Sequence, residues 1–208
     1  MTTRNPYELD GLPEELVALA DTIRTFLATL PVDDEVRANT PNRFVKALYD
    51  CLEGYRQDVT DHLKLFPDDD TDHGNGEVVI VNVPFYSLCE HHLLPFFGTM
   101  TIAYVPSDYV LGLSKLNRIV HTFARRLQLQ ERLTEQVVTT LLSPPVNARG
   151  ALAVSRARHM CVEMRGVRQV TTTTVVHYGG CLRPDTEWWK SVAPLVERET
   201  KSIPPLDV

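Results

Sequence analysis

The order of hydrophobic patterns along the chain predicts an α+β fold, in which helices cover an antiparallel sheet. Two helical patterns come first, followed by two strand patterns, two further helical patterns and a second pair of strand patterns. With 208 residues, of which 43% are hydrophobic, the chain is long enough to bury one substantial core. This length favours one domain, or one domain with a small addition.

An N-terminal helical pair is predicted before the first strand pattern. Apolar residues recur at helical spacing between residues 13 and 30, and Pro31 ends that pattern. The second helix is expected to begin at Thr40, a good N-cap residue, with Pro41 at the first helical position. It should run to about Cys51.

The rest of the pattern alternates strands with helices. β-Branched or alternating segments predict strands over residues 78–85, 99–105, 150–165 and 170–178. Between the two pairs of strands, Ser114 is expected to cap one helix, and Gln130 stands at the joint to the next. The tail beyond Cys181 has no assigned element.

Charge and composition exclude several classes of function. The net charge of −6 at pH 7 argues against a general binder of nucleic acid or of anionic membranes. No run of about 18 apolar residues occurs, so no membrane span is expected. The first residues lack the apolar segment of a secretory signal, and four cysteines without a dense framework fit a reducing compartment. We therefore expect a cytoplasmic protein.

Two short groups of potential metal ligands lie far apart in the sequence, at residues 89–92 (Cys-Glu-His-His) and 159–161 (His-Met-Cys). Cys89 and His92 are three apart, a spacing from which one turn can present both side chains to a metal. Brought together, the groups offer a Cys, His, Cys set with one open position, which is typical of a catalytic site. Cysteine-rich ligation favours zinc over magnesium. The alternative is that Cys161 is a buried apolar residue and His159 a satisfied polar one.

The second group is predicted to present its side chains from a strand. If residues 151–165 are pleated, His159, Cys161 and Arg165 share one face, because residues two apart in a strand point to the same side. All three side chains would then face one cavity, with mostly apolar residues packing behind them.

Polar side chains at the two predicted helix starts are suited to bind an anion and an amidine-like hydrogen-bonding edge. Lys115 and Arg118 lie one turn apart where free N–H groups and the helix dipole favour an anion. Gln130 and Glu131 follow at the next helix, and a carboxylate can accept two parallel hydrogen bonds from an amidine-like edge. A solvated helix face and an exposed helix-end glutamate remain the alternatives.

Taken together, these motifs resemble the GTP cyclohydrolase I family. The resemblance is nearly continuous over residues 78–180 and extends more loosely to the Thr-Pro-Asn-Arg of residues 40–43. It is carried by residues 87–95 (Ser-Leu-Cys-Glu-His-His-Leu-Leu-Pro), 102–106 (Ile-Ala-Tyr-Val-Pro), 112–120 (Gly-Leu-Ser-Lys-Leu-Asn-Arg-Ile-Val), 128–134 (Gln-Leu-Gln-Glu-Arg-Leu-Thr), 159–161 (His-Met-Cys) and 165–168 (Arg-Gly-Val-Arg). The set is specific, although no single motif is.

The resemblance implies the tunnelling fold (T-fold), in which subunits join their sheets into pentameric barrels and two barrels stack into a decamer with intersubunit active sites. It implies an N-terminal helical region over residues 1–65, a T-fold catalytic domain over 66–190 and a C-terminal tail over 191–208. The implied reaction converts GTP and water into 7,8-dihydroneopterin triphosphate and formate. No nucleic-acid or membrane partner is implied.

The resemblance also implies roles for residues of this sequence. Zinc would be held by Cys89, His92 and Cys161. Catalytic roles would fall to His91, His159 and Ser114. Guanine would be recognised by Gln130 and Glu131, and the triphosphate by Lys115, Arg118, Arg165 and Arg43.

Departures from the family pattern leave alternatives open. Residues 31–39 form a shorter segment than usual, and His177 and Tyr178 stand where small hydroxyl residues are expected. One alternative is a non-catalytic paralogue that binds zinc and a purine nucleotide, and another is a paralogue whose reaction stops after ring opening. A zinc nucleobase deaminase is disfavoured because the chain has no Pro-Cys-x-x-Cys motif.

Overall fold

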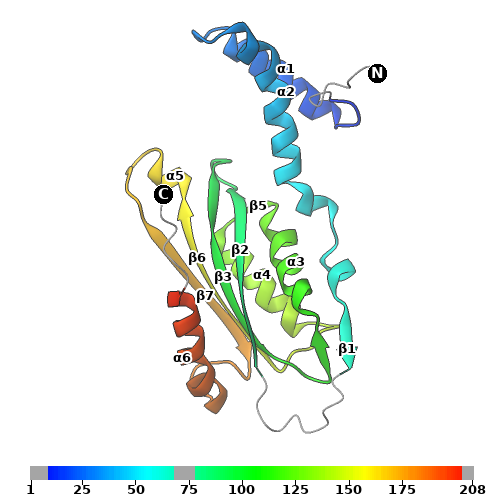
Figure 1. Ribbon diagram of the computed structural model, residues 1–208, viewed down its shortest axis with the longest axis vertical. Coiled ribbons are helices and arrows are strands. Elements are labelled where there is room, and N and C mark those ends of the chain that lie inside the picture. Colours follow the sequence, from blue (N-terminus) through cyan, green and yellow to red (C-terminus); the bar gives the residue numbers. More distant parts are fainter. Residues whose placement is uncertain (1–8, 68–77, 203–208) are drawn as a thin grey trace. The chain divides into compact units, whose positions relative to one another are not determined.

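The computed structural model describes residues 9–67 and 78–202, and the chain divides into two compact units, Met1–Glu53 and Gly54–Val208. The first unit is a pair of helices, α1 (Glu14–Leu27) and α2 (Asp34–Cys51), which pack together and bury Ala20 and Val45. Figure 1 shows both helices in blue and cyan.

The helical pair confirms the predicted helices, but α2 begins at Asp34 rather than at Thr40. The Asp33 side chain accepts a hydrogen bond of 2.8 Å from the Val36 N–H and so caps the helix. Two acidic residues in the first turn complement the helix dipole. This earlier start outweighs Pro41, which lies buried inside the helix instead of at its first position.

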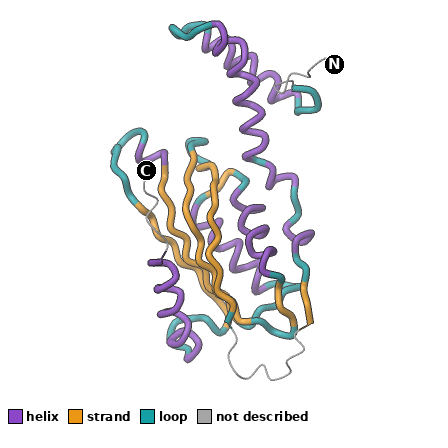
Figure 2. The backbone as a smooth tube through the Cα atoms, viewed as in Figure 1, coloured by secondary structure: helices purple, strands orange, loops and turns teal. Residues whose placement is uncertain are grey.

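The second unit is built on a five-stranded sheet of order β5-β2-β3-β6-β7 (Figures 1 and 2). Its strands are β2 (Val79–Cys89), β3 (Pro95–Val105), β5 (Leu127–Gln128), β6 (Gly150–His159) and β7 (Thr172–Gly180). All neighbours are antiparallel except β5, which pairs with β2 in parallel. A separate two-stranded sheet joins β1 (Leu65–Pro67) to β4 (Tyr109–Leu111). The predicted α+β class is confirmed.

Helices cover both faces of the larger sheet (Figure 1). On one face lie α3 (Leu113–Ala124) and α4 (Gln130–Leu142), and on the other lies α6 (Glu187–Ser202). The short elements η1 (Glu53–Arg56), η2 (Val59–His62) and α5 (Met160–Glu163) complete the chain. Alternation along β6 divides the core, because Ala151 and Ala153 join the α3–α4 side while Leu152 joins the α6 side.

Helix α6 occupies a tail to which the sequence pattern assigned no element. Its residues Val192 and Val196 are buried against the sheet, and Trp189 meets the Tyr178 ring edge-on at 5.4 Å. Tyr178 therefore packs against α6 within the chain. Among the described residues, no helix is both long and apolar enough to cross a membrane.

Candidate metal centre and active site

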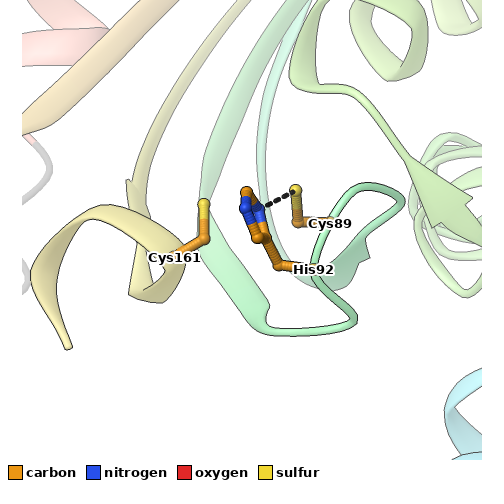
Figure 3. A group of neighbouring side chains, drawn as sticks. All are labelled: Cys89, His92 and Cys161. Carbon is orange, nitrogen blue, oxygen red and sulfur yellow. Dashed lines mark hydrogen bonds between the residues drawn. The ribbon is translucent and has the colours of Figure 1, made fainter. Parts of the chain in front are cut away.

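The predicted metal ligands Cys89, His92 and Cys161 lie together at one end of the sheet. One ligand atom from each residue lies within 4.8 Å of the others, and Cys89 Sγ is 3.9 Å from His92 Nδ1 (Figure 3). Tetrahedral zinc bonds of about 2.0–2.3 Å place ligand atoms roughly 3.5–3.8 Å apart. The cluster needs to contract by only about 1 Å at most to meet that geometry. These residues therefore fit a tetrahedral metal of the zinc type.

A tight turn brings His92 back towards Cys89. Cys89 ends β2, and its N–H donates to the Leu94 carbonyl at 2.9 Å. The Leu93 N–H donates to the Cys89 carbonyl at 2.8 Å, and Leu93 takes a left-handed φ of 54°. The turn thus fixes the backbone on both sides of His92, as the three-residue spacing predicted.

The position of Cys161 differs from the prediction. Strand β6 ends at His159, and Cys161 lies in the short helix α5, so the two side chains do not share a strand face. The Arg158 Nε donates to Glu163 Oε1 at 2.9 Å, and its Nη2 bonds Oε2. Five further residues of extended strand would separate these side chains by about 16 Å. The ion pair therefore requires the chain to turn, and the turn directs Cys161 to the cluster.

Burial raises the pKa of the Cys161 thiol, and the neighbouring Cys89 raises this pKa further. The charge of Arg165, an exposed residue in the loop after α5, acts in the opposite direction. Two thiols held together in this way favour a bound cation, because a metal ion stabilises the thiolates that crowding disfavours.

Two histidines stand beside the cluster. His91 is exposed, and its ring lies edge-on to His92 at a centroid distance of 6.2 Å. His159 is half-buried, and burial lowers its pKa, while the charges of Glu131 and Glu163 oppose that shift. The Nε2 atom of His159 lies 2.8 Å from Gln130 Oε1. Gln130 is 1% exposed, whereas Glu131 is exposed in the first turn of α4.

Each of the two turns that carry the clustered side chains is tied to the scaffold by an arginine–carboxylate pair that the sequence did not predict. Glu90 binds Arg132 of α4 through two hydrogen bonds of 2.6 and 3.1 Å. Glu163 binds Arg158, and these side chains are only 8% and 11% exposed. The two residues of each pair are not spaced like neighbours on one helix or strand, so no sequence pattern indicated either ion pair.

We expect Glu163→Gln to weaken zinc binding by about tenfold, because it loosens the turn that carries Cys161. Competition with a chromophoric chelator measures the zinc dissociation constant directly. Glu197→Gln is the matched control, since it breaks an exposed pair with Lys201 on α6 and should leave zinc affinity unchanged. Equal affinities for Glu163→Gln and the parent protein would show that the turn holds its shape without the pair.

Ser114 and Lys115 begin α3 at the opposite end of the sheet from the cluster, and Arg118 lies one turn further along the helix. Leu111 lies just before these residues in the chain, and its N–H donates to the Tyr104 hydroxyl at 3.0 Å. Tyr104 in turn pairs with Val79, the first residue of β2. Cys89 is the last residue of β2, which rises about 33 Å over its ten residue steps. One chain therefore does not bring these side chains to the cluster. Ser114 is also not the helix cap, because α3 begins at Leu113 after Gly112.

Arg43 lies on α2 in the first unit. Its Nη2 donates to Glu35 Oε1 at 2.7 Å. The pair links residues two turns apart on the same helix.

Known proteins match most of the length of this chain. The family model described as GTP cyclohydrolase I matches residues 19–197. GTP cyclohydrolase 1 of Campylobacter jejuni strain RM1221 is 51% identical over 138 residues, which cover 65% of this chain and 70% of that protein. GTP cyclohydrolase 1 of Wolinella succinogenes is 41% identical over 168 residues, covering 79% and 87% respectively. The protein of the same name from Campylobacter concisus is 43% identical over 77% and 85%.

The matched region contains both ligand groups and both helix starts to which the motifs pointed. The resemblance inferred from those motifs is thus confirmed over most of the chain. This chain belongs to the GTP cyclohydrolase I family of enzymes.

Proposed function

We propose that this protein is a zinc-dependent GTP cyclohydrolase I that opens the imidazole ring of GTP at C8, releases formate and forms 7,8-dihydroneopterin triphosphate. The observation that carries the proposal is the grouping of Cys89, His92 and Cys161 within 4.8 Å, next to His159 and the start of α4. Family membership supports the same reaction. Because thiolate ligands need a reducing compartment, we also propose a cytoplasmic location.

Zinc bound by these three residues would activate water as a nucleophile at neutral pH. The two histidines would then move protons. His91, exposed beside the cluster, is suited to protonate purine N7 while the C8–N9 bond loosens. His159 would serve formate release or the rearrangement of the ribose. Imidazole suits both tasks because it titrates near neutral pH.

Recognition of guanine is assigned to the first turn of α4. Glu131 is exposed there, and its carboxylate can accept the two parallel hydrogen bonds that the N1–H and N2–H₂ edge offers. The predicted contact of Gln130 with guanine stays a prediction, because its side-chain amide bonds protein groups in the free enzyme.

Binding of the triphosphate is assigned to cations from both ends of the sheet. Arg165 lies near the metal ligands, as its charge effect on Cys161 indicates. Lys115 and Arg118 lie at the start of α3, together with Ser114, the residue assigned to the ribose steps. One nucleotide cannot span β2 from end to end, so we propose that α3 of a neighbouring subunit supplies these groups. Arg43 is a further candidate for the triphosphate.

An assembly through sheet edges would provide such a neighbour. Among the described residues, β7 pairs with β6 alone, and β5 supplies only two residues beside β2. Both edges can therefore accept a strand from another subunit. We propose the homodecamer of two stacked pentamers that the family resemblance implies, with active sites between subunits.

The decisive experiment follows formate release and, after oxidation, pterin fluorescence from zinc-replete protein given GTP. Both signals, abolished by a chelator, are expected. Formate without pterin would indicate a reaction arrested after ring opening, and would direct attention to Ser114 and His159. Neither signal from zinc-loaded protein that binds GTP would favour a non-catalytic paralogue and overturn the proposal.

A further inference from the structure

A buried hydrogen-bond network lies behind His159, on the side away from solvent. Gln130, Thr134 and Ser155 are each at most 1% exposed. The Gln130 Nε2 donates to Ser155 O at 3.1 Å, to Ser155 Oγ at 3.0 Å and to Thr173 O at 3.1 Å. Its Oε1 lies 2.8 Å from His159 Nε2. The Gln130 amide thus joins α4 to β6 and to Thr173, the second residue of β7.

The chemistry of these partners fixes the orientation of the Gln130 amide. Backbone carbonyls only accept hydrogen bonds, so the amide NH₂ must face Ser155 O and Thr173 O. A reversed amide would place its oxygen against two carbonyl oxygens. The oxygen Oε1 must therefore face His159. This orientation of the amide follows from its hydrogen-bonding partners alone.

The two hydroxyls agree with this orientation. Thr134 Oγ1 donates to the Gln130 backbone carbonyl at 2.7 Å, and this bond uses the only proton of the Thr134 hydroxyl. The 2.7 Å contact between Thr134 Oγ1 and Ser155 Oγ then requires Ser155 to be the donor. Ser155 Oγ is left as an acceptor for Gln130 Nε2. Each hydroxyl proton thus has one place, and the two protons of the Gln130 amide are shared among its three acceptors, Ser155 O, Ser155 Oγ and Thr173 O.

This order determines which nitrogen of His159 carries the proton. An amide oxygen can only accept, so His159 Nε2 must donate to it. In a neutral imidazole the other nitrogen, Nδ1, then holds the free lone pair. The Phe96 ring stacks on His159 in parallel at a centroid distance of 4.8 Å and fixes the plane of the imidazole.

We propose that Gln130 is a positioning residue, which holds neutral His159 in the Nε2–H tautomer so that Nδ1 is the nitrogen that exchanges protons with the substrate. The inference rests on the proposed function for the identity of that substrate. It differs from a direct contact with guanine, because Gln130 acts through His159 and its effect is present before GTP binds.

The tautomer can be measured in zinc-loaded protein without GTP. Protein labelled with ¹³C,¹⁵N-histidine gives distinct solid-state NMR signals for the two tautomers, whatever the size of the assembly. The His159 signals are identified by their loss in His159→Asn. We expect a single Nε2–H form in the parent protein. A Nδ1–H form, or a mixture, would overturn the inference without any variant of Gln130.

Gln130→Met tests the cause, because methionine keeps the buried volume and removes both amide functions. We expect mixed His159 tautomers and a fall in kcat of about 10- to 100-fold with KM changed by less than about threefold. Gln128→Met is the matched control, since Gln128 is 2% exposed and bonds Phe123 O and Gln136 Oε1 but not His159. It should leave the His159 signals as in the parent protein.

Two results would contradict a positioning role. One is an unchanged His159 spectrum in Gln130→Met. The other is a rise in KM with kcat preserved, which would indicate a direct guanine contact. Both can be told apart from failure of the proposed function, which would appear as absent GTP turnover in the parent protein while its tautomer signals stay readable.

Discussion

Replacement of Cys161 by alanine is expected to abolish zinc binding and GTP ring opening together, with turnover falling by about 1,000-fold or more. The variant keeps Cys89 and His92, which lie 3.9 Å apart, but a catalytic zinc site needs three protein ligands. Two ligands from one turn leave the metal open to solvent and to chelators. Zinc content after gel filtration, measured by mass spectrometry, and formate release from GTP check the two parts of this expectation.

The matched control for this substitution is Cys181→Ala. Cys181 is also partly buried, and burial likewise raises the pKa of its thiol, but it packs with the α6 side of the core. This variant should retain zinc and turnover. A Cys161→Ala protein that is free of zinc and fully active would disprove the metal dependence, and one that retains zinc would disprove the assignment of Cys161 as a ligand.

Much of this cluster could be predicted because its causes are local. Cys89 and His92 lie in one turn, so their spacing alone restricts their geometry. The strands that lead to the two ligand groups, β2 and β6, both pair with β3. Alternating and β-branched segments give strong strand signals, and adjacent strands bring their ends together.

The parts that could not be predicted depend on contacts between distant residues or on competing local signals. Helix α5 replaces the expected strand because Arg158 and Glu163 pair across it, and a four-residue helix has no periodicity to detect. The early start of α2 reflects a second cap at Asp33, which competes with the Thr40 signal. The bonds of Gln130 involve β6 and β7, so its burial follows from tertiary packing alone.

Mixed oligomers should recover activity that neither parent variant has. Cys161→Ala removes one of the three proposed metal ligands, and a Lys115→Ala/Arg118→Ala protein lacks two cations of α3. If each active site takes its metal centre from one subunit and its α3 cations from another, random 1:1 assembly leaves about one site in four intact. The measurement is GTP turnover of co-expressed, differently tagged variants after tandem affinity purification. Each variant purified alone should be nearly inactive.

The size of the recovery distinguishes the possible arrangements of the site. If one chain supplied both groups, every chain in the mixture would lack either Cys161 or the two α3 cations, and no activity would return. Co-expression of Cys161→Ala with Cys89→Ala is the internal control, since both substitutions damage the same cluster and no pairing of subunits repairs it. Recovery near a quarter in the first mixture and none in the second would establish that the active site lies between subunits. No recovery in either mixture would show that one chain supplies both groups and would overturn the intersubunit site, whereas full activity of the Lys115→Ala/Arg118→Ala protein by itself would remove the proposed role of Lys115 and Arg118.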